Sequence, residues 1–265
     1  VSEKCLYLIG EMLYDKDMKK WIYRIVLLAA ICVFSFSAFQ LYKIYKESKM
    51  IDQENEKLQE IAKIEDNANK TLTIDWTALK QSAPDVVGWV YVPGLDSVSF
   101  PIVQGSDNTY YLNHTTLGET NIRGSIFLDA GAAPDFSDEN NVVYGHSVEG
   151  GGMFTSMDRF EDASFFETHP VFYVLTPSQN YKCDVLAFSK TTEGTSFYTK
   201  YDLTQTTEHA NEMISQATYS RNIPVEGKRF ITLSTCDLDY GFDSINRLVL
   251  VGVMEPTTEP IQMEE

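Results

Sequence analysis

A long uncharged run near the start of the chain is its clearest hydrophobic feature. Residues 25–42 carry no charge, and residues 25–39 are almost wholly apolar. A run of this length can cross a bilayer as one helix, and the aromatic side chains at both ends suit the membrane interface. A buried core helix or a cleaved signal peptide would show a similar run, but lysines follow it directly and no small-residue cleavage site is present. We predict a membrane-spanning helix over residues 21–43, preceded by an N-terminal segment, residues 1–20.

A charged segment without glycine or proline follows this span. Its few apolar positions fall at helical spacing: Ile51, Leu58, Ile61 and Ile64. This thin stripe predicts a helix, and its polar surroundings favour a solvated stalk over residues 44–70 that only spaces a domain from the bilayer. Asp75 then suits the N-cap of a short helix that begins at Trp76.

The pattern changes to short β-branched and aromatic runs beyond residue 85. Eight such runs, separated by turn residues, are predicted as strands: 86–92, 98–103, 124–128, 141–145, 171–175, 182–188, 229–236 and 247–254. Eight short strands favour one closed barrel or a sandwich. Apolar residues at helical spacing over 203–219 predict a helix inserted between two late strands. Residues 256–265, rich in glutamate with two prolines, predict a disordered acidic tail.

Charge narrows the range of partners. The chain carries a net charge of −17; the first 49 residues are positive by three and the remainder is negative by about twenty. No basic stripe is available to replace the counterions of a nucleic acid, so we expect no nucleic-acid partner. An acidic, solvated domain suits an extracytoplasmic surface without indicating a particular ligand. Lysine and arginine are nearly balanced on the two sides of the apolar run, which leaves the orientation of the span open.

One of the four cysteines stands where chemistry is plausible. Cys236 ends an apolar strand, and Arg247 opens the next strand eleven residues later. A lone cysteine on an apolar strand is usually a core residue, and the arginine has the alternative of an ordinary surface position. A thiol at a strand end, with a cation nearby, nevertheless fits covalent catalysis. Cys183, within an ordinary strand, is interpreted as structural, and the cysteine spacings match neither a zinc module nor a disulfide framework.

A thiol nucleophile needs a base, and four histidines are available. His146 is the first choice because it follows an apolar strand and precedes a glycine-rich turn, although a structural histidine would also fit there. His114, in a polar loop, is the second choice. Asp237, Asp239 and Asp243 crowd the loop after Cys236; one of them could orient His146, but a solvated loop explains them equally. No close pair of ligands anchors a metal to Cys236, so we expect neither a metal nor another cofactor.

Several linked motifs give this sequence a family resemblance. They are DW at 75–76, PDVVGWV at 84–90, PIVQ at 101–104, DNTYYL at 107–112, GSIFLD at 124–129, YGH at 144–146 with MF at 153–154, and TLSTC at 232–236. In order and spacing, over about residues 74–254, these motifs resemble the class B sortases. The resemblance implies a closed eight-stranded sortase-type barrel with N-terminal helices and a helix inserted between late strands, here within a catalytic domain of residues 71–255.

The resemblance also implies roles for individual residues. Cys236 resembles the nucleophile of the family, His146 the general acid and base, and Arg247 the cation that stabilises an oxyanion or clamps the substrate. Ser234 and Leu112 are expected to help seat the substrate, with Tyr198 as a further expectation. The sequence leaves open whether the acidic loop favours the imidazolium more than it disfavours the thiolate.

By the same resemblance, the chain is expected to be a membrane-anchored cysteine transpeptidase. Its substrates would be surface proteins with a C-terminal sorting signal, cleaved after threonine through a Cys thioester, and the acceptor an amine of peptidoglycan precursor or of a pilin lysine. The N-terminus would be cytoplasmic and the catalytic domain extracellular, on a Gram-positive type of cell surface. A catalytically degenerate binding or scaffold domain and a thiol hydrolase are the alternatives. The sorting signal, the acceptor and the oligomeric state stay open.

Overall fold

A computed structural model describes residues 3–62, 71–95, 98–148, 152–241 and 244–263. The chain divides into two compact units, Val1–Lys49 and Met50–Glu265. Helix α1 (Glu3–Ile61) belongs to both units: its residues up to Lys49 lie in the first unit, and its residues 50–61 lie in the second. Helices α2 (Trp76–Ser82), α3 (Ala163–Thr168) and α4 (Thr206–Gln216) belong to the second unit. Asp75 caps α2 as predicted, because its carboxylate accepts a hydrogen bond from the Ala78 N–H.

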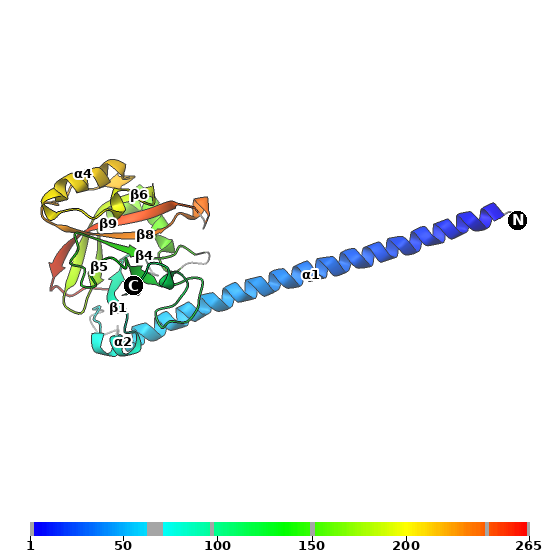
Figure 1. The fold of residues 1–265 in the computed structure, drawn as a ribbon, viewed down its shortest axis with the longest axis horizontal. Coiled ribbons are helices and arrows are strands. Elements are labelled where there is room, and N and C mark those ends of the chain that lie inside the picture. Colours follow the sequence, from blue (N-terminus) through cyan, green and yellow to red (C-terminus); the bar gives the residue numbers. More distant parts are fainter. Residues whose placement is uncertain (1–2, 63–70, 96–97, 149–151, 242–243, 264–265) are drawn as a thin grey trace. The chain divides into compact units, whose positions relative to one another are not determined.

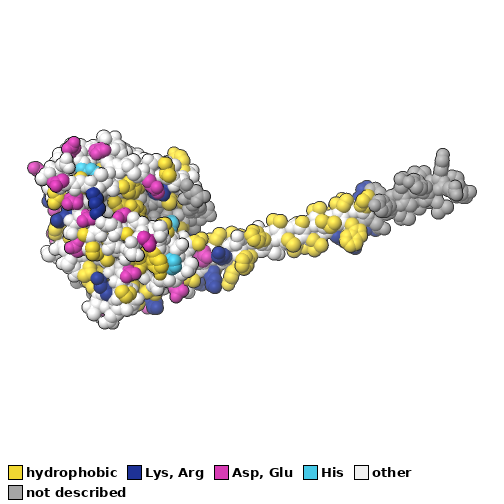
Figure 2. Space-filling view, viewed as in Figure 1, with side chains coloured by type: hydrophobic (Ala, Val, Ile, Leu, Met, Phe, Trp, Pro, Cys, Tyr) yellow, Lys and Arg dark blue, Asp and Glu magenta, His cyan; other side chains and the backbone are white. Residues whose placement is uncertain are grey.

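The exposed part of α1 carries the predicted span. Within Met18–Ile61 an 18-residue window has a mean hydropathy of 2.2 and no buried residues. Figure 2 shows its apolar side chains turned outward along the helix. By length and composition the helix can cross a membrane, and its exposure excludes a buried core helix.

The second unit is built around one closed sheet. Its strands are β1 (Val86–Tyr91), β2 (Ser99–Val103), β3 (Ile126–Leu128), β4 (Asn140–Tyr144), β5 (Val171–Leu175), β6 (Asn180–Thr192), β7 (Tyr219–Ser220), β8 (Arg229–Cys236) and β9 (Asn246–Thr257). They follow the order β5-β1-β2-β3-β4-β8-β9-β6-β7, and a further pairing of β5 with β6 closes an eight-stranded barrel. The predicted closed barrel is thereby confirmed, and all eight predicted runs are strands of it. The additional short strand β7 pairs with Ala187 and Phe188 of β6, further along β6 than residues 180–184, which pair with β5.

The barrel is mixed because two of its pairings are parallel. Strand β2 runs parallel to β3, and β4 runs parallel to β8, while the remaining pairs are antiparallel. The carboxyl ends of β4 and β8 therefore lie at the same edge of the barrel. The segments that follow these two strands begin at this edge, and the predicted nucleophile and base lie there.

The inserted helix is confirmed with changed boundaries. A 3-10 turn (Leu203–Gln205) precedes α4, and the helix ends at Gln216. Tyr219, predicted as the last residue of this helix, instead begins β7 with Ser220, because their backbone pairs with β6. The apolar face of α4, including Ala210 and Met213, packs on Phe230 of β8 and Val251 of β9. Figure 1 shows the helix lying outside the barrel, next to β6 and β9.

The prediction of a solvated stalk is wrong for residues 50–62. Ile51 belongs to the barrel core, and Leu58 and Ala62 are buried in a second cluster with residues of α2 and β1. The Leu117 N–H also donates a hydrogen bond to Glu54 Oε1 of the same helix. The thin apolar stripe is thus a packing face, and the compact unit begins at Met50 rather than at residue 71. Residues 63–70 lie outside the described residues.

The prediction of a disordered tail is also wrong for residues 256–263, the part of the tail that the structure describes. Strand β9 continues to Thr257, which pairs with Asn180 of β6. Ile261 is 3% exposed and packs in the cluster that contains Leu58, and its carbonyl accepts a hydrogen bond of 2.8 Å from the Leu72 N–H. One buried isoleucine and a continued strand ladder outweigh the local preference of glutamate and proline for disorder.

Candidate active site

Strands β8 and β9 bring the predicted thiol and guanidinium together. Cys236 is the last residue of β8 and pairs directly with Arg247, the second residue of β9. Directly opposed residues of an antiparallel pair project to the same face of the sheet, so the two side chains share one side of the barrel edge. Arg247, which was predicted near the start of the next strand, therefore lies directly opposite Cys236.

His146 reaches the same edge from strand β4. The parallel register places Tyr144 beside Ser234, and the Gly145 N–H donates a 3.0 Å hydrogen bond to the Ser234 carbonyl. A Cβ atom on Gly145 would lie 2.6 Å from the ring of Phe154, so only glycine lets this ring pack against the backbone before His146. The glycine-aromatic contact and the strand pairing together set the direction in which the chain leaves β4.

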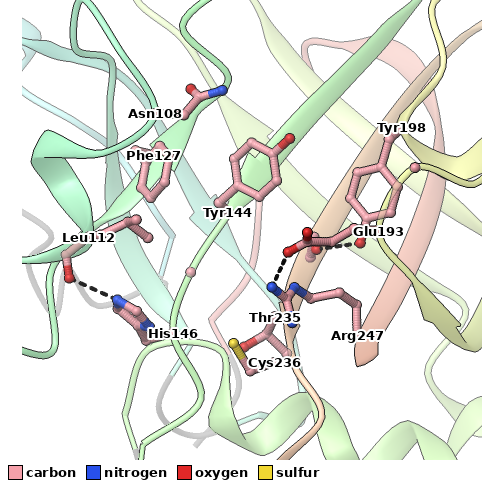
Figure 3. Close-up of a pocket in the computed structure, with 13 residues that line it drawn as sticks. Asn108, Leu112, Phe127, Tyr144, His146, Glu193, Tyr198, Thr235, Cys236 and Arg247 are labelled. Atoms are coloured by element: carbon pink, nitrogen blue, oxygen red, sulfur yellow. Dashed lines mark hydrogen bonds and ion pairs between the residues drawn. The ribbon is translucent and has the colours of Figure 1, made fainter. Parts of the chain in front are cut away.

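One cavity of about 350 Å³ contains all six residues predicted for the site. Its lining includes Cys236, His146, Arg247, Ser234, Leu112 and Tyr198. Figure 3 shows Cys236 between the His146 ring and the Arg247 guanidinium in this view. A thiol, an imidazole and a guanidinium around one cavity can carry out acyl transfer, since they supply a nucleophile, a proton carrier and a charge for an oxyanion.

The hydrogen bond of His146 determines its neutral tautomer. Nε2 lies 2.8 Å from the Leu112 carbonyl oxygen. A carbonyl can only accept, so Nε2 carries the proton and Nδ1 keeps a lone pair in the neutral ring. Burial lowers the pKa of His146; the Leu112 carbonyl opposes this shift and the nearby Arg247 adds to it. The ring is therefore neutral at neutral pH and can accept a proton at Nδ1.

A buried hydrogen bond joins the segments that carry the thiol and the imidazole. Ser147 Oγ lies 2.8 Å from Thr235 Oγ1, and both residues are buried. Ser147 follows His146 directly and Thr235 precedes Cys236. The half-buried Cys236 thiol itself has no hydrogen-bond partner within the described part of the chain. The connection between the two functional residues thus runs through their neighbours.

Arg247 is held in place by three groups. One terminal nitrogen donates to the carbonyls of Ser244 (2.7 Å) and Asn246 (2.9 Å), and the other forms an ion pair with Glu193. The arginine side chain is 18% exposed, whereas Glu193 is 55% exposed. The planar guanidinium can hold all three acceptors at once, which restricts its orientation in the cavity.

Aromatic side chains form the wall opposite these polar groups. The Tyr144 and Tyr198 rings stack with centroids 6.5 Å apart, and Phe127 packs on Tyr144. The Tyr198 hydroxyl lies 2.8 Å from Ser234 Oγ. Burial is the main cause that raises the pKa of Tyr198 to about 12, so its hydroxyl stays protonated and available as a donor. This wall suits an extended peptide that presents both apolar and amide groups.

The other histidines and Cys183 lie outside this cavity. His114 stacks on Tyr110 and bonds to its carbonyl. His169 stacks on Phe165, and His209, on the buried face of α4, stacks on Tyr201. Cys183 is fully buried on β6, and burial raises the pKa of its thiol well above the ordinary value. Of the four histidines, His146 is the one that lines the cavity with Cys236.

Asp237 and Asp239, the described carboxylates of the acidic loop, do not orient His146. Asp237 and Asp239 turn toward a second cavity, where they approach Glu161 of a 3-10 helix (Thr155–Glu161). Ligand atoms of these three residues lie within 4.8 Å of one another, but Lys190 Nζ contacts all three at 2.9–3.4 Å. Burial alone would lower the pKa of Lys190, yet its hydrogen bonds to Glu161 and Asp239 raise it, so a stable ammonium occupies this position. Asp243 lies outside the described residues.

Sequence reasoning missed several lining residues. Glu193 was not singled out, and Asn108, Phe127 and Tyr144 appeared only as members of motifs. Phe127 and Tyr144 lie on predicted strands, where alternation could have placed them on the cavity side. Nothing local indicates Glu193, because its ion pair depends on a partner 54 residues away.

Comparison with known proteins identifies the family. A family model described as a sortase domain matches residues 90–255, and a curated sortase B of Listeria monocytogenes is 32% identical over 190 residues, 70% of this chain and 76% of that protein. The chain belongs to the sortase family, in class B.

Solved structures of class B sortases share the fold of this sortase. A sortase B–substrate complex from Staphylococcus aureus superposes with a TM-score of 0.69 at 26% identity, over 80% of this chain and 100% of that one. A class B sortase of Streptococcus pyogenes, described as involved in pilus biogenesis, superposes with a TM-score of 0.61 at 29% identity, over 68% and 98%. Members of the family are cysteine transpeptidases that are associated with the Gram-positive cell surface and act on sorting signals, and this sortase is a cysteine transpeptidase.

Proposed function

We propose that this sortase cleaves a C-terminal sorting signal after threonine through a thioester on Cys236 and passes the acyl group to an amine. The observation that carries the proposal is the single cavity shared by Cys236, His146 and Arg247. A nucleophile, a base with an available lone pair and a fixed cation are the three requirements of acyl transfer to and from a thiol.

In the acylation step the neutral His146 ring takes the thiol proton at Nδ1. The sulfur of Cys236 attacks the threonine carbonyl carbon, and negative charge develops on the carbonyl oxygen. The Arg247 guanidinium stabilises that charge, which is worth several kcal/mol in a partly dry cavity. The imidazolium then protonates the leaving amine, the C–N bond breaks and the thioester remains. The lowered pKa of His146 makes its imidazolium a good proton donor.

The substrate-seating role falls to Ser234, Leu112 and Tyr198. Ser234 and Tyr198 present a pair of bonded hydroxyls, and the exposed Leu112 side chain offers an apolar contact next to His146. The carbonyl of Leu112 is occupied by His146, so this residue links substrate position to the orientation of the base.

The donors in this proposal are surface proteins that carry the sorting signal. The acceptor is an amine of peptidoglycan precursor or of a pilin lysine; involvement of the Streptococcus pyogenes relative in pilus biogenesis supports the second source. Helix α1 anchors the enzyme, with the N-terminus in the cytoplasm and the catalytic domain outside the cell, where such substrates occur.

The test uses the full chain in detergent micelles with a panel of sorting-signal peptides. Intact-mass spectrometry is expected to detect an acyl adduct on Cys236 that is absent from the Cys236→Ala variant and transfers to an added amine. An adduct that yields only the hydrolysed acid would establish a thiol hydrolase instead. No adduct with any peptide, together with a Cys236 thiol that resists alkylation, would support a degenerate scaffold and reject the proposal.

A further inference from the structure

Cys236 lines a second cavity, separate from the one that contains His146 and Arg247. This cavity has a volume of about 600 Å³ and lies on the side of β8 where the 3-10 helix Thr155–Glu161 meets the loop after Cys236. Its acidic lining residues are Asp158, Glu161, Asp162, Asp237 and Asp239, which we call the acidic groove. Cys236 therefore borders both cavities.

The two cavities differ sharply in charge. The first contains Glu193 paired with Arg247, and its remaining lining is aromatic, aliphatic or neutral apart from His146. The acidic groove has five carboxylates against Arg159 in its lining and the adjacent Lys190, a net charge of −3. A concave surface of one sign concentrates ligands of the opposite sign.

Asp237 is the carboxylate of the groove that neighbours Cys236 in the chain. It follows Cys236 directly and is 2% exposed, and it lines the groove. Its Oδ1 accepts the Asp239 N–H, but Oδ2 accepts no hydrogen bond among the described residues and has only the Lys190 ammonium 3.4 Å away. A buried carboxylate oxygen with unused hydrogen-bonding capacity favours a further donor.

The carboxylates of the groove already bind one ammonium group, that of Lys190. Its Nζ lies 2.9 Å from Glu161 and 3.0 Å from Asp239, in addition to Asp237. Asp158 forms no ion pair of this kind among the described residues. Burial raises its pKa and the charges of Glu161 and Asp239 add to the shift, while the backbone N–H and the charge of Arg159 oppose it. An incoming ammonium would relieve that repulsion.

We propose that the acidic groove binds the acceptor substrate, a primary amine that arrives as a cation. The proposal rests on the proposed function, because the acyl chain of the thioester would still occupy the first cavity when the acceptor arrives. A second approach to the same sulfur lets the amine reach the thioester carbonyl without displacing that chain.

The transfer step removes two protons from the amine and replaces the C–S bond by a C–N bond. The bound ammonium gives one proton to the neutral His146, and the amine nitrogen attacks the thioester carbonyl carbon. The C–N bond forms, the C–S bond breaks, and the sulfur leaves with its electron pair and takes a second proton from the former amine. The products are the amide and the Cys236 thiol, and His146 returns its proton to solvent.

The experiment compares a cationic with a neutral nucleophile, using the full chain in detergent. After acylation by a sorting-signal peptide, transfer is measured to Nα-acetyl-lysine amide, which has one ammonium, and to hydroxylamine, which is neutral. For Asp158→Asn we expect the KM of the lysine derivative to rise about 3-fold, and for Asp158→Lys about 10-fold, with transfer to hydroxylamine unaffected. Asp239→Asn, at a highly exposed position, provides a second neutralisation.

Glu226→Lys is the matched control, since Glu226 is an exposed carboxylate outside the groove. It is expected to leave both acceptors unchanged. An equal effect of Asp158→Lys and Glu226→Lys, equal effects on both nucleophiles, or an unchanged KM would each overturn the acceptor site while leaving the thioester mechanism intact. Failure to form the adduct on Cys236 would instead remove the proposed function and this inference with it.

Discussion

At the scale of single residues, environment separates the site residues from others of the same type. Cys183 and Cys236 both lie on strands, but the first is sealed in the core and the second ends its strand between two cavities. His146 differs from His209 because it has a carbonyl partner and a cavity beside it, whereas His209 is covered by aromatic rings. Burial and neighbours therefore decide which of two equal side chains is available for chemistry.

Arg247→Lys tests whether charge alone is sufficient in the cavity. Lysine keeps the charge but cannot hold two carbonyls and Glu193 in one plane, so we expect the acylation rate to fall about 100-fold. Glu193→Gln is the matched control: it removes an exposed partner, while the Ser244 and Asn246 carbonyls still hold the guanidinium, and we expect less than about a 5-fold change. Single-turnover mass spectrometry measures both rates. An equally large loss in Glu193→Gln would make the ion pair the decisive feature.

Gly145→Ala tests the packing that directs His146. The added methyl would meet the Phe154 ring, and we expect a destabilisation of about 1–3 kcal/mol together with slower acylation, because His146 is the next residue. Gly131→Ala, whose Cβ would meet only a side-chain oxygen at 3.2 Å, is expected to be mild. Denaturant unfolding and acylation kinetics report the two effects. Normal acylation by Gly145→Ala would show that the ring contact does not position the base.

At the scale of elements, helix α4 covers the outer face of β8 and β9 rather than the cavity. His209 and Met213 project from it onto Phe230, the second residue of the strand that ends at Cys236. The Nε2 atom of His209 has no hydrogen-bond partner among the described residues. The helix therefore supports the strand that ends at Cys236 through a face that contains a buried titratable ring.

The stability of the domain should consequently depend on His209 at mildly acid pH. Burial lowers the pKa of His209 below its ordinary value of 6.5, and Glu212 only partly opposes the shift. The unfolded state then binds more protons, so the free energy of unfolding falls as the pH drops below 6.5. We expect His209→Phe and His209→Gln to reduce this slope when each is compared with its own stability at about pH 8. The remaining slope includes His146, whose pKa shifts in the same direction. An unchanged slope in both variants would contradict the prediction.

At the scale of the whole molecule, two distant segments complete the catalytic unit. The end of α1 supplies Leu58, the turn after it supplies Ala62, and the C-terminal segment supplies Ile261 to one cluster with α2 and β1. A backbone bridge between Thr71 and Gln262 joins the segment before α2 to the C-terminal segment. These residues outside the strands thus cover the face of β1 that carries Trp89, opposite the face whose Val90 lies in the barrel core.

A fragment of residues 50–265 should therefore be more stable than a fragment of residues 71–255. The shorter one loses the burial of Leu58 and Ile261 and exposes their partners, which we expect to lower Tm by about 10 °C. Leu58→Ala in the longer fragment should cost about 2–5 kcal/mol by itself, with the exposed Lys57→Ala as the control. Calorimetry measures both; equal Tm values would mean that these segments contribute nothing to folding.

The sequence by itself determined the elements and most of the site. Strand alternation, turn residues and the cap at Asp75 act over a few residues, so the eight barrel strands and the short helix were predictable, and the linked motifs indicated Cys236, His146 and Arg247. Only the tertiary structure decided the packing of both ends of the domain, the partnership of Glu193 with Arg247, and the turn of Asp237 away from His146. These features depend on strand register and on contacts between segments far apart in the chain, and no local pattern of residues contains that information.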